Sequence, residues 1–285
     1  MTIDPACVGC IINQSRRVAD AIHADAALRT AIVQSVEAMA PGFAFTQSPP
    51  EVATPVYEKM AELASKSDLY DEVKAHSTKV ASLLLPELRE AIRTSDDRLL
   101  SATKVAVAGN VIDLAAEVSF DLHDELEKVF ETGFALNDFD RLKGTLEKAQ
   151  SLLYIGDNAG EHLFDYLYIE TLRQLYPALH IIYMVRGRPI INDVTMKEAL
   201  EAGFDRLCDL VDSGVDTPGF VYGRANAPSR ELFDSADLVL TKGMGNYECL
   251  SPAPRGNICY LLKVKCQVVA NALQAEIGDL VCKLS

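Results

Sequence analysis

The feature that most constrains the fold is a change of hydrophobic period across residues 151–170. Residues 152–155 form a short apolar run (LLYI) typical of a buried strand, whereas leucines and aromatic residues recur at helical spacing from residue 163 onward. The polar turn GDNAGE, residues 156–161, lies between the two patterns. In an open parallel sheet, turns at the carboxyl ends of strands collect ligands, and the following helix presents unpaired backbone N–H groups. Function is therefore expected at this turn.

The first hundred residues show helical periodicity almost without interruption and no convincing strand pattern. A connector at residues 40–50, which contains proline and glycine, predicts a loop. The pattern therefore predicts a helical domain over residues 1–100, with helices at residues 10–24, 26–39, 55–65, 70–84 and 86–94.

After one more predicted helix at residues 101–121, short apolar runs alternate with helical or polar segments. This alternation is typical of an α/β domain with a parallel sheet, predicted here over residues 101–285. Right-handed crossovers would gather the carboxyl ends of its strands at one edge. The predicted strands are residues 152–155, 180–185, 207–211, 238–241 and 268–270.

Composition narrows the possible partners. The chain has 285 residues, 49% of them hydrophobic, which is enough to bury a substantial core. Its 41 acidic and 27 basic residues give a formal net charge of -14, which argues against a nucleic-acid surface. No leader pattern or membrane-length apolar segment is seen, so a soluble, cytoplasmic protein is expected. An acidic chain must hold an anionic substrate through a few placed cations or a metal.

Three predicted strand ends carry polar clusters. The first contains Asp157 and Asn158, the second (RGRPIINDVT) contains Arg186 and Asp193, and the third (KGMGNYE) begins with Lys242. Each acidic or amide residue has a simpler interpretation as the N-cap of the helix that follows. The coincidence of three such clusters at one edge of a sheet favours a shared site.

Two carboxylates and a carboxamide, from Asp157, Asp193 and Asn158, suit a hard divalent cation. Oxygen ligands favour magnesium or manganese, and open water positions would also admit cobalt or nickel. Such a metal polarises a phosphoryl group and activates water, while a lysine offsets developing charge. The chemistry that fits is hydrolysis of a phosphate ester, with phosphate oxygens held by Lys242, Arg186 or Arg188.

The predicted helix at residues 101–121 contains an unusual Gly-Asn pair. Gly109 lowers helix propensity by about 1 kcal/mol relative to alanine, and Asn110 and Asp113 are three residues apart, which puts them on one face. Either Gly109 is a packing residue beside a hydrogen-bonded asparagine, or the two polar side chains project toward a site.

The seven cysteines lack the dense spacing of a disulfide scaffold, so mostly reduced thiols are expected. Cys7 and Cys10 form a single CxxC pair, which is half of a zinc site at most. A redox role would require a βαβ context that this helical region lacks. A structural or incidental role is therefore favoured.

Six segments in order carry a family resemblance: CxxC (7–10), AGNVID (108–113), GDNAGE (156–161), RGRPIINDVT (186–195), KGMGNYE (242–248) and LLKVKCQVVA (261–270). Together they resemble the CxxC-bearing branch of the damage-control phosphatases, a family first catalogued as domain of unknown function eighty-nine. The resemblance covers nearly the whole chain. It implies a helical N-terminal domain on a Rossmann-like, three-layer α/β/α domain with a mainly parallel sheet. It also implies a metal-dependent phosphatase, stimulated by cobalt, nickel, manganese or magnesium, that acts on small phosphorylated metabolites such as sugar phosphates.

The resemblance further implies roles for individual residues. Asp157, Asn158 and Asp193 match the metal positions, and Lys242 joins Asp157 and Asn158 as a catalytic residue. Gln267 stands where the family pattern has a proline, a departure that concerns the start of a local element rather than the chemistry. The substrate-side positions are Asn110, Asp113, Arg186, Asn246, Glu248 and Lys265.

Two other functions remain open at this stage. A methyltransferase, an activity proposed for relatives, would need an adenosine pocket, and no glycine-rich loop followed by an acidic ribose ligand stands out. A non-catalytic module could bind a sugar phosphate or nucleotide at the same edge. A covalent aspartyl-phosphate route through Asp157 is disfavoured because Ala159 stands where a second acid would be needed. Neither the phosphate ester nor the oligomeric state follows from the sequence.

Overall fold

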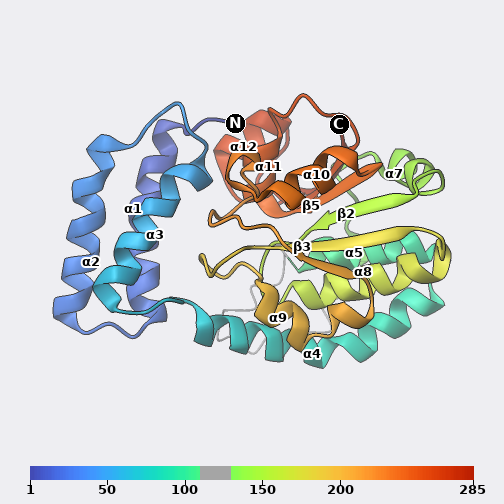
Figure 1. Cartoon of the computed structure of the whole chain (residues 1–285), viewed down its shortest axis with the longest axis horizontal. Coiled ribbons are helices and arrows are strands. Elements are labelled where there is room, and N and C mark those ends of the chain that lie inside the picture. Colours follow the sequence, from blue (N-terminus) through green and yellow to red (C-terminus); the bar gives the residue numbers. More distant parts are fainter. Residues whose placement is uncertain (110–129) are drawn as a thin grey trace.

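The computed structural model describes residues 1–109 and 130–285. Within these residues the centre of the molecule is a seven-stranded sheet in the order β1-β7-β6-β5-β2-β3-β4 (Figure 1). Neighbouring strands run parallel except for β6 and β7. The strands are β1 (Leu136–Asn137), β2 (Ser151–Ile155), β3 (His180–Val185), β4 (Asp209–Asp212), β5 (Leu238–Lys242), β6 (Ile258–Lys263) and β7 (Leu280–Leu284).

The central strand β2 shows why the chain forms three layers. Leu152 and Tyr154 point into one hydrophobic core, and Leu153 and Ile155 point into the other, because successive side chains alternate between the two faces of a strand. All four are fully buried. A parallel strand covered on both faces therefore reads as a continuous apolar run rather than an alternating one.

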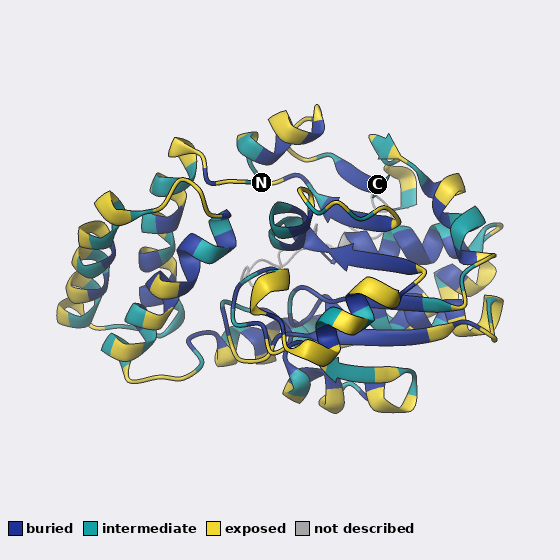
Figure 2. Cartoon of the chain, turned by 45° about the horizontal axis from the view of Figure 1, so that its top comes forward, coloured by how far each residue is buried: buried dark blue, intermediate teal, exposed yellow. Residues whose placement is uncertain are grey.

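Helices cover both faces of the sheet, and buried residues concentrate in the strands and the inner helix faces (Figure 2). The core on one face receives side chains from α4 (Asp71–Thr94), α5 (Arg98–Ala108), α7 (Phe139–Leu146), α8 (His162–Leu175) and α9 (Met196–Glu201). The opposite core receives them from α10 (Ala227–Ser235), α11 (Gly243–Leu250) and α12 (Gln267–Leu273). The expected mixed fold with a mainly parallel sheet is confirmed.

The helices α1 (Pro5–Ala21), α2 (Ala26–Met39) and α3 (Pro49–Ala64) form a bundle beside the sheet, at the left of Figure 1. Side-chain oxygens of Asp4 and Asp25 cap α1 and α2. The bundle has its own core, and one residue of that core, Ile190, comes from the loop after β3. That loop therefore connects the bundle to the edge of the sheet.

Packing changes between α3 and α4. The buried residues of α4, such as Leu84 and Leu88, join the core on one face of the sheet rather than the core of the bundle. The predicted division of the chain at residue 100 into independent domains stays a prediction. Among the described residues, no helix has the length and apolar character that crossing a membrane requires.

One predicted strand was wrong, and three of the described strands were missed. Residues 268–270 form part of α12 rather than a strand, because Val269, Ala270 and Leu273 face the core at helical spacing. The antiparallel pair β6 and β7 and the short β1 were missed.

The helix predicted at residues 10–24 is α1, which spans Pro5–Ala21. Two prolines explain other differences among the early helices. The helix α3 begins at Pro49, since Ser48 caps it and proline suits the first helical turn. The helix α4 continues through Pro86, which lies on its exposed face, where the carbonyl group that loses its partner can be hydrated.

Candidate active site

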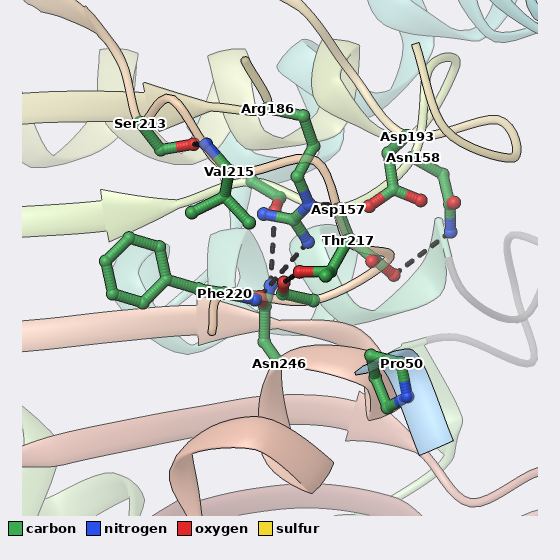
Figure 3. A network of polar contacts seen from close by, with 12 residues as sticks. Pro50, Asp157, Asn158, Arg186, Asp193, Ser213, Val215, Thr217, Phe220 and Asn246 are labelled. Carbon is green, nitrogen blue, oxygen red and sulfur yellow. Dashed lines mark hydrogen bonds and ion pairs between the residues drawn. The ribbon is translucent and has the colours of Figure 1, made fainter. Parts of the chain in front are cut away.

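The GDNAGE turn and the loop after β3 lie side by side at the carboxyl edge of the sheet (Figure 3). Asn158 and Asp193 form an isolated antiparallel bridge. Next to it, the Val194 N–H donates to the Asp157 carbonyl oxygen at 2.8 Å. These backbone contacts bring the three predicted metal ligands, Asp157, Asn158 and Asp193, together.

Asp157 and Asp193 are buried, with 8% and 3% of their surface exposed. Burial and the charge of Asp193 raise the pKa of Asp157 to about 7. Burial also raises the pKa of Asp193 to about 6, although Arg186 opposes the shift. For both carboxylates, burial therefore outweighs the stabilising effect of the nearby cations on the ionised form.

The Asp157 carboxylate lies against the backbone at the start of α11. Gly243 has a φ of 76°, and a Cβ atom added there would lie 1.9 Å from Asp157 Oδ2. Only glycine accepts both the left-handed conformation and this close approach. The first glycine of the KGMG string is thus required by the position of Asp157.

Arg186 and Asn246 connect the three strand ends (Figure 3). Arg186 is buried, and its Nε donates to Asp193 Oδ2 at 2.7 Å while Nη2 donates to Asn246 Oδ1 at 3.1 Å. The Asn246 amide in turn donates to the carbonyl oxygens of Gly156 and Lys242 at 3.2 and 2.7 Å. Arg186 and Asn246, both predicted on the substrate side, therefore hold the loops together. Arg186 Nη1 remains a donor without a partner among the described residues.

The predicted catalytic residue Lys242 is fully buried and is held by an acid that the sequence did not suggest. Its Nζ donates to Asp165 Oδ1 at 2.8 Å. Asp165 also accepts hydrogen bonds from the hydroxyl groups of Tyr154 and Tyr183 at 2.6 and 3.1 Å. Burial opposes the charged form of Lys242, but Asp165 and Glu161 outweigh it, so the pKa of Lys242 is raised. Lys242 therefore remains a cation beneath the turn.

Glu161, the last residue of the GDNAGE string, was also missed. It is 4% exposed, and its Oε2 lies 3.9 Å from Lys242 Nζ. Its Oε1 accepts a hydrogen bond from Asn158 Nδ2 at 3.1 Å. Burial raises the pKa of Glu161 to about 7, against the opposing effect of Lys242.

Two further predicted substrate-side residues lie at the margin of this group. Glu248 is half-buried, and burial together with the charge of Asp157 raises its pKa to about 7. Lys265 is exposed, yet close enough for its charge to oppose the rise in the pKa of both Asp157 and Glu161. Lys265 is thus a cation between solvent and the buried carboxylates.

Other residues singled out from the sequence lie elsewhere. Asn110 and Asp113 fall outside the described residues. Arg188 is exposed and pairs with Glu58 of the bundle and with Asp216. All seven cysteines are free thiols, and in the CxxC pair Cys7 is half-buried and Cys10 is exposed.

The charge balance of the buried groups provides a test of whether a cation fits. We define the edge cluster as the fully or nearly fully buried charged side chains of this site that the structure describes. It contains four acids, Asp157, Glu161, Asp165 and Asp193, and two bases, Arg186 and Lys242. An uncompensated buried charge is costly, and two more acids than bases match the charge of one divalent cation.

The donor set is consistent with a hard ion rather than a soft one. Among residues 1–109 and 130–285, no three His, Cys, Asp or Glu side chains are grouped as a metal site would need. The candidate set instead combines two carboxylates with the carboxamide of Asn158. Two protein carboxylates with open positions for water and phosphate are typical of magnesium and related ions.

Comparisons with known proteins identify the family of the chain. The family model described as damage-control phosphatase ARMT1-like domain matches residues 3–281. A damage-control phosphatase of Archaeoglobus fulgidus is 31% identical over 290 residues, covering 100% of this chain and 99% of the relative. A damage-control phosphatase of Pyrococcus horikoshii is 30% identical over 284 residues, covering 99% of this chain and 98% of the relative.

A solved structure extends the likeness to three dimensions. The crystal structure of a Pyrococcus horikoshii protein, described as a member of the family of domain of unknown function eighty-nine, has a TM-score of 0.92. The alignment covers 100% of this chain and 99% of that chain at 28% sequence identity. The chain therefore belongs to the damage-control phosphatase ARMT1-like family, and it is a phosphatase.

Proposed function

We propose that this phosphatase depends on a divalent metal and hydrolyses a small phosphomonoester, such as a sugar phosphate. Asp157, Asn158 and Asp193 would hold the metal. The observation that carries this proposal is the edge cluster, which buries two more acids than bases among the described residues. Burial, which nearby cations only partly offset, raises the pKa of Asp157 to about 7 and that of Asp193 to about 6, and a bound cation would lower both.

When bound, a divalent cation at such a site polarises the phosphoryl group and lowers the pKa of a water molecule. Oxygen ligands suit magnesium or manganese, and cobalt or nickel would also be accepted. The protein's own contribution is positioning and charge. Lys242, fixed by Asp165, offsets negative charge that develops on the phosphate.

Substrate entry is governed by a few cations in an acidic chain. The chain carries a formal net charge of -14, so a phosphate ester is drawn in only where cations are placed. Lys265 is exposed at the margin of the cluster, and Lys242 lies buried within it. This arrangement favours a small substrate whose phosphate passes Lys265 and reaches the edge cluster.

The test measures phosphate release from a panel of phosphorylated metabolites and a generic aryl phosphate. Each reaction is run with chelator and then with added manganese, cobalt, nickel or magnesium, beside Asp157→Ala. We expect release that requires metal and falls more than about 100-fold in the variant, since loss of a ligand should exceed the 10–100-fold cost of losing a supporting partner. Full release by the unaltered protein in chelator would refute metal dependence.

A further inference from the structure

The carboxamide of Asn158 can serve a cation through only one of its two atoms. Its oxygen is an acceptor, whereas its nitrogen carries two N–H donors and repels a cation. A half-turn of the amide exchanges them, so the orientation decides whether Asn158 is a ligand. The groups that receive the two N–H bonds set that orientation.

Both N–H donors of Asn158 have acceptors in the structure. Asn158 Nδ2 lies 3.0 Å from Asp157 Oδ2 and 3.1 Å from Glu161 Oε1. In the part of the chain that the structure describes, no donor bonds to the amide oxygen. Asp157 is itself a proposed ligand whose charge a cation would share, whereas Glu161 lies outside the proposed ligand set.

Glu161 is in turn fixed from two sides. The C-cap of α5 approaches it so closely that a Cβ atom added to Gly109 would lie 3.0 Å from Cβ and Cγ of Glu161, and also 3.0 Å from Cδ2 of Phe164. At the other end of the side chain, Oε2 is 3.9 Å from Lys242 Nζ. The side chain therefore has little freedom to turn away from Asn158.

We propose that Glu161 is a positioning residue that orients the Asn158 carboxamide with its oxygen toward the metal, and that Gly109 is required because a larger residue would displace Glu161. This inference rests on the proposed metal site. It gives Gly109, the C-cap residue of α5, a functional reason to be glycine. It also makes Glu161 a link between the metal ligands and Lys242.

Four variants separate this role from other roles. Glu161→Ala removes the acceptor, while Glu161→Gln retains an acceptor oxygen without the charge. Gly109→Ala keeps Glu161 but crowds it. Asn158→Asp replaces the amide by a carboxylate with two equivalent oxygens, for which orientation no longer matters.

The experiment is a calorimetric titration of each metal-free, full-length variant with Mn²⁺, with thermal unfolding as a check of the fold. We expect Glu161→Ala and Gly109→Ala to weaken Mn²⁺ binding about 10- to 100-fold, the usual effect of losing a group that orients a ligand. Glu161→Gln should change it by less than about 3-fold, below the range for losing such a group, because the acceptor oxygen is retained. In the Asn158→Asp background, Glu161→Ala should not weaken binding.

The outcomes that contradict the proposal are distinct. Equal losses in Glu161→Gln and Glu161→Ala would show that the charge of Glu161 matters, as for a direct ligand. An equal loss from Glu161→Ala in the Asn158→Asp background would show that Glu161 acts independently of the amide. If Asp157→Ala binds Mn²⁺ as the unaltered protein does, or neither binds it, the proposed metal site itself is wrong and this inference fails with it.

Discussion

The molecule buries charge in two places that are built in opposite ways. In the first, which we call the interface triad, Lys74 of α4 is 2% exposed and lies between Asp68 and Glu198. Its Nζ donates to Glu198 Oε1 at 2.8 Å, and Glu198 Oε2 accepts from the backbone N–H of Thr195 at 2.9 Å. In the edge cluster, by contrast, the carboxylates of Asp157 and Asp193 lie close to each other.

The pKa values record the difference. In the interface triad, burial alone would raise the pKa of Glu198, but Lys74 and Thr195 lower it to about 2. In the edge cluster, burial and like charge raise the pKa of Asp157 to about 7. The charges of the interface triad are paired within the protein, whereas the excess acids of the edge cluster would be balanced by the cation of the proposed metal site.

The largest expected effect comes from breaking the interface triad. Lys74→Met leaves the buried carboxylate of Glu198 without a cation, which should lower the free energy of unfolding by about 3–5 kcal/mol. Chemical denaturation measures the change. The double variant with Glu198→Gln should recover most of the loss, and a single variant within about 1 kcal/mol of the unaltered protein would show that the triad adds no more than an exposed pair.

Removing a charge from the edge cluster should raise the free energy of unfolding rather than lower it. Asp157→Asn removes one of two mutually repelling buried charges. The metal-free protein should therefore gain stability on the order of 4 kcal/mol at pH 7.5, since the pKa of Asp157 is raised from 3.8 to about 7 and each unit is worth about 1.4 kcal/mol. Asp165→Asn is the matched control, because Asp165 faces Lys242 directly and its loss should destabilise. Chemical denaturation of both variants in chelator measures these changes. If both variants were destabilised, the edge cluster would not differ from the interface triad in this respect.

The pH dependence of stability sharpens the comparison. Raised carboxylate pKa values mean that the folded state holds more protons than the unfolded state between about pH 4 and 7, so the contribution of the edge cluster falls as the pH rises through that range. The contribution of Glu198 is present above its ordinary value of 4.5 and is lost as the pH falls toward its folded value of about 2.

Unfolding midpoints of the metal-free protein should therefore decline between about pH 5 and 7.5. The variant Asp157→Asn/Asp193→Asn should flatten that decline, and so should saturating Mn²⁺ in the unaltered protein. If neither change altered the decline of the unfolding midpoint with pH, the groups responsible would lie outside the edge cluster.

The smallest effect is expected at the surface. Arg188 is exposed and pairs with Glu58 and Asp216, and exposed ion pairs contribute about 0–1 kcal/mol. Arg188→Ala should therefore lower the free energy of unfolding by less than about 1 kcal/mol, measured by denaturation at low and high salt. If Arg188→Ala lowered the free energy of unfolding as much as Lys74→Met does, the exposed and buried ion pairs would not differ in their contribution to stability.

Much of the candidate site could be proposed from the sequence because its residues follow strands with a clear pattern. Asp157, Asn158 and Lys242 come directly after apolar runs that end at one edge of a parallel sheet. The fold class follows from the same alternation of strand and helix patterns. Asn110 and Asp113 belong to the part of the prediction that the described residues do not address.

The residues that were missed are acids in helical sequence. Glu161 and Asp165 precede or begin α8, where acidic residues ordinarily lie in solvent and favour the positive end of the helix. A signal for Asp165 was present, since it shares its helix face with Tyr168, Ile169 and Leu172, which are all buried. An acid in the middle of an apolar stripe needs a buried partner, and Lys242 is that partner.

Ile190 connects the helical bundle to the loop that carries Asp193. Ile190 lies in the core of α1–α3, three residues ahead of Asp193 on the same loop. A fragment that begins at α4 would keep every strand that the structure describes but would release this anchor. A change in the length of the bundle would thus displace the loop that carries Asp193, one of the proposed metal ligands.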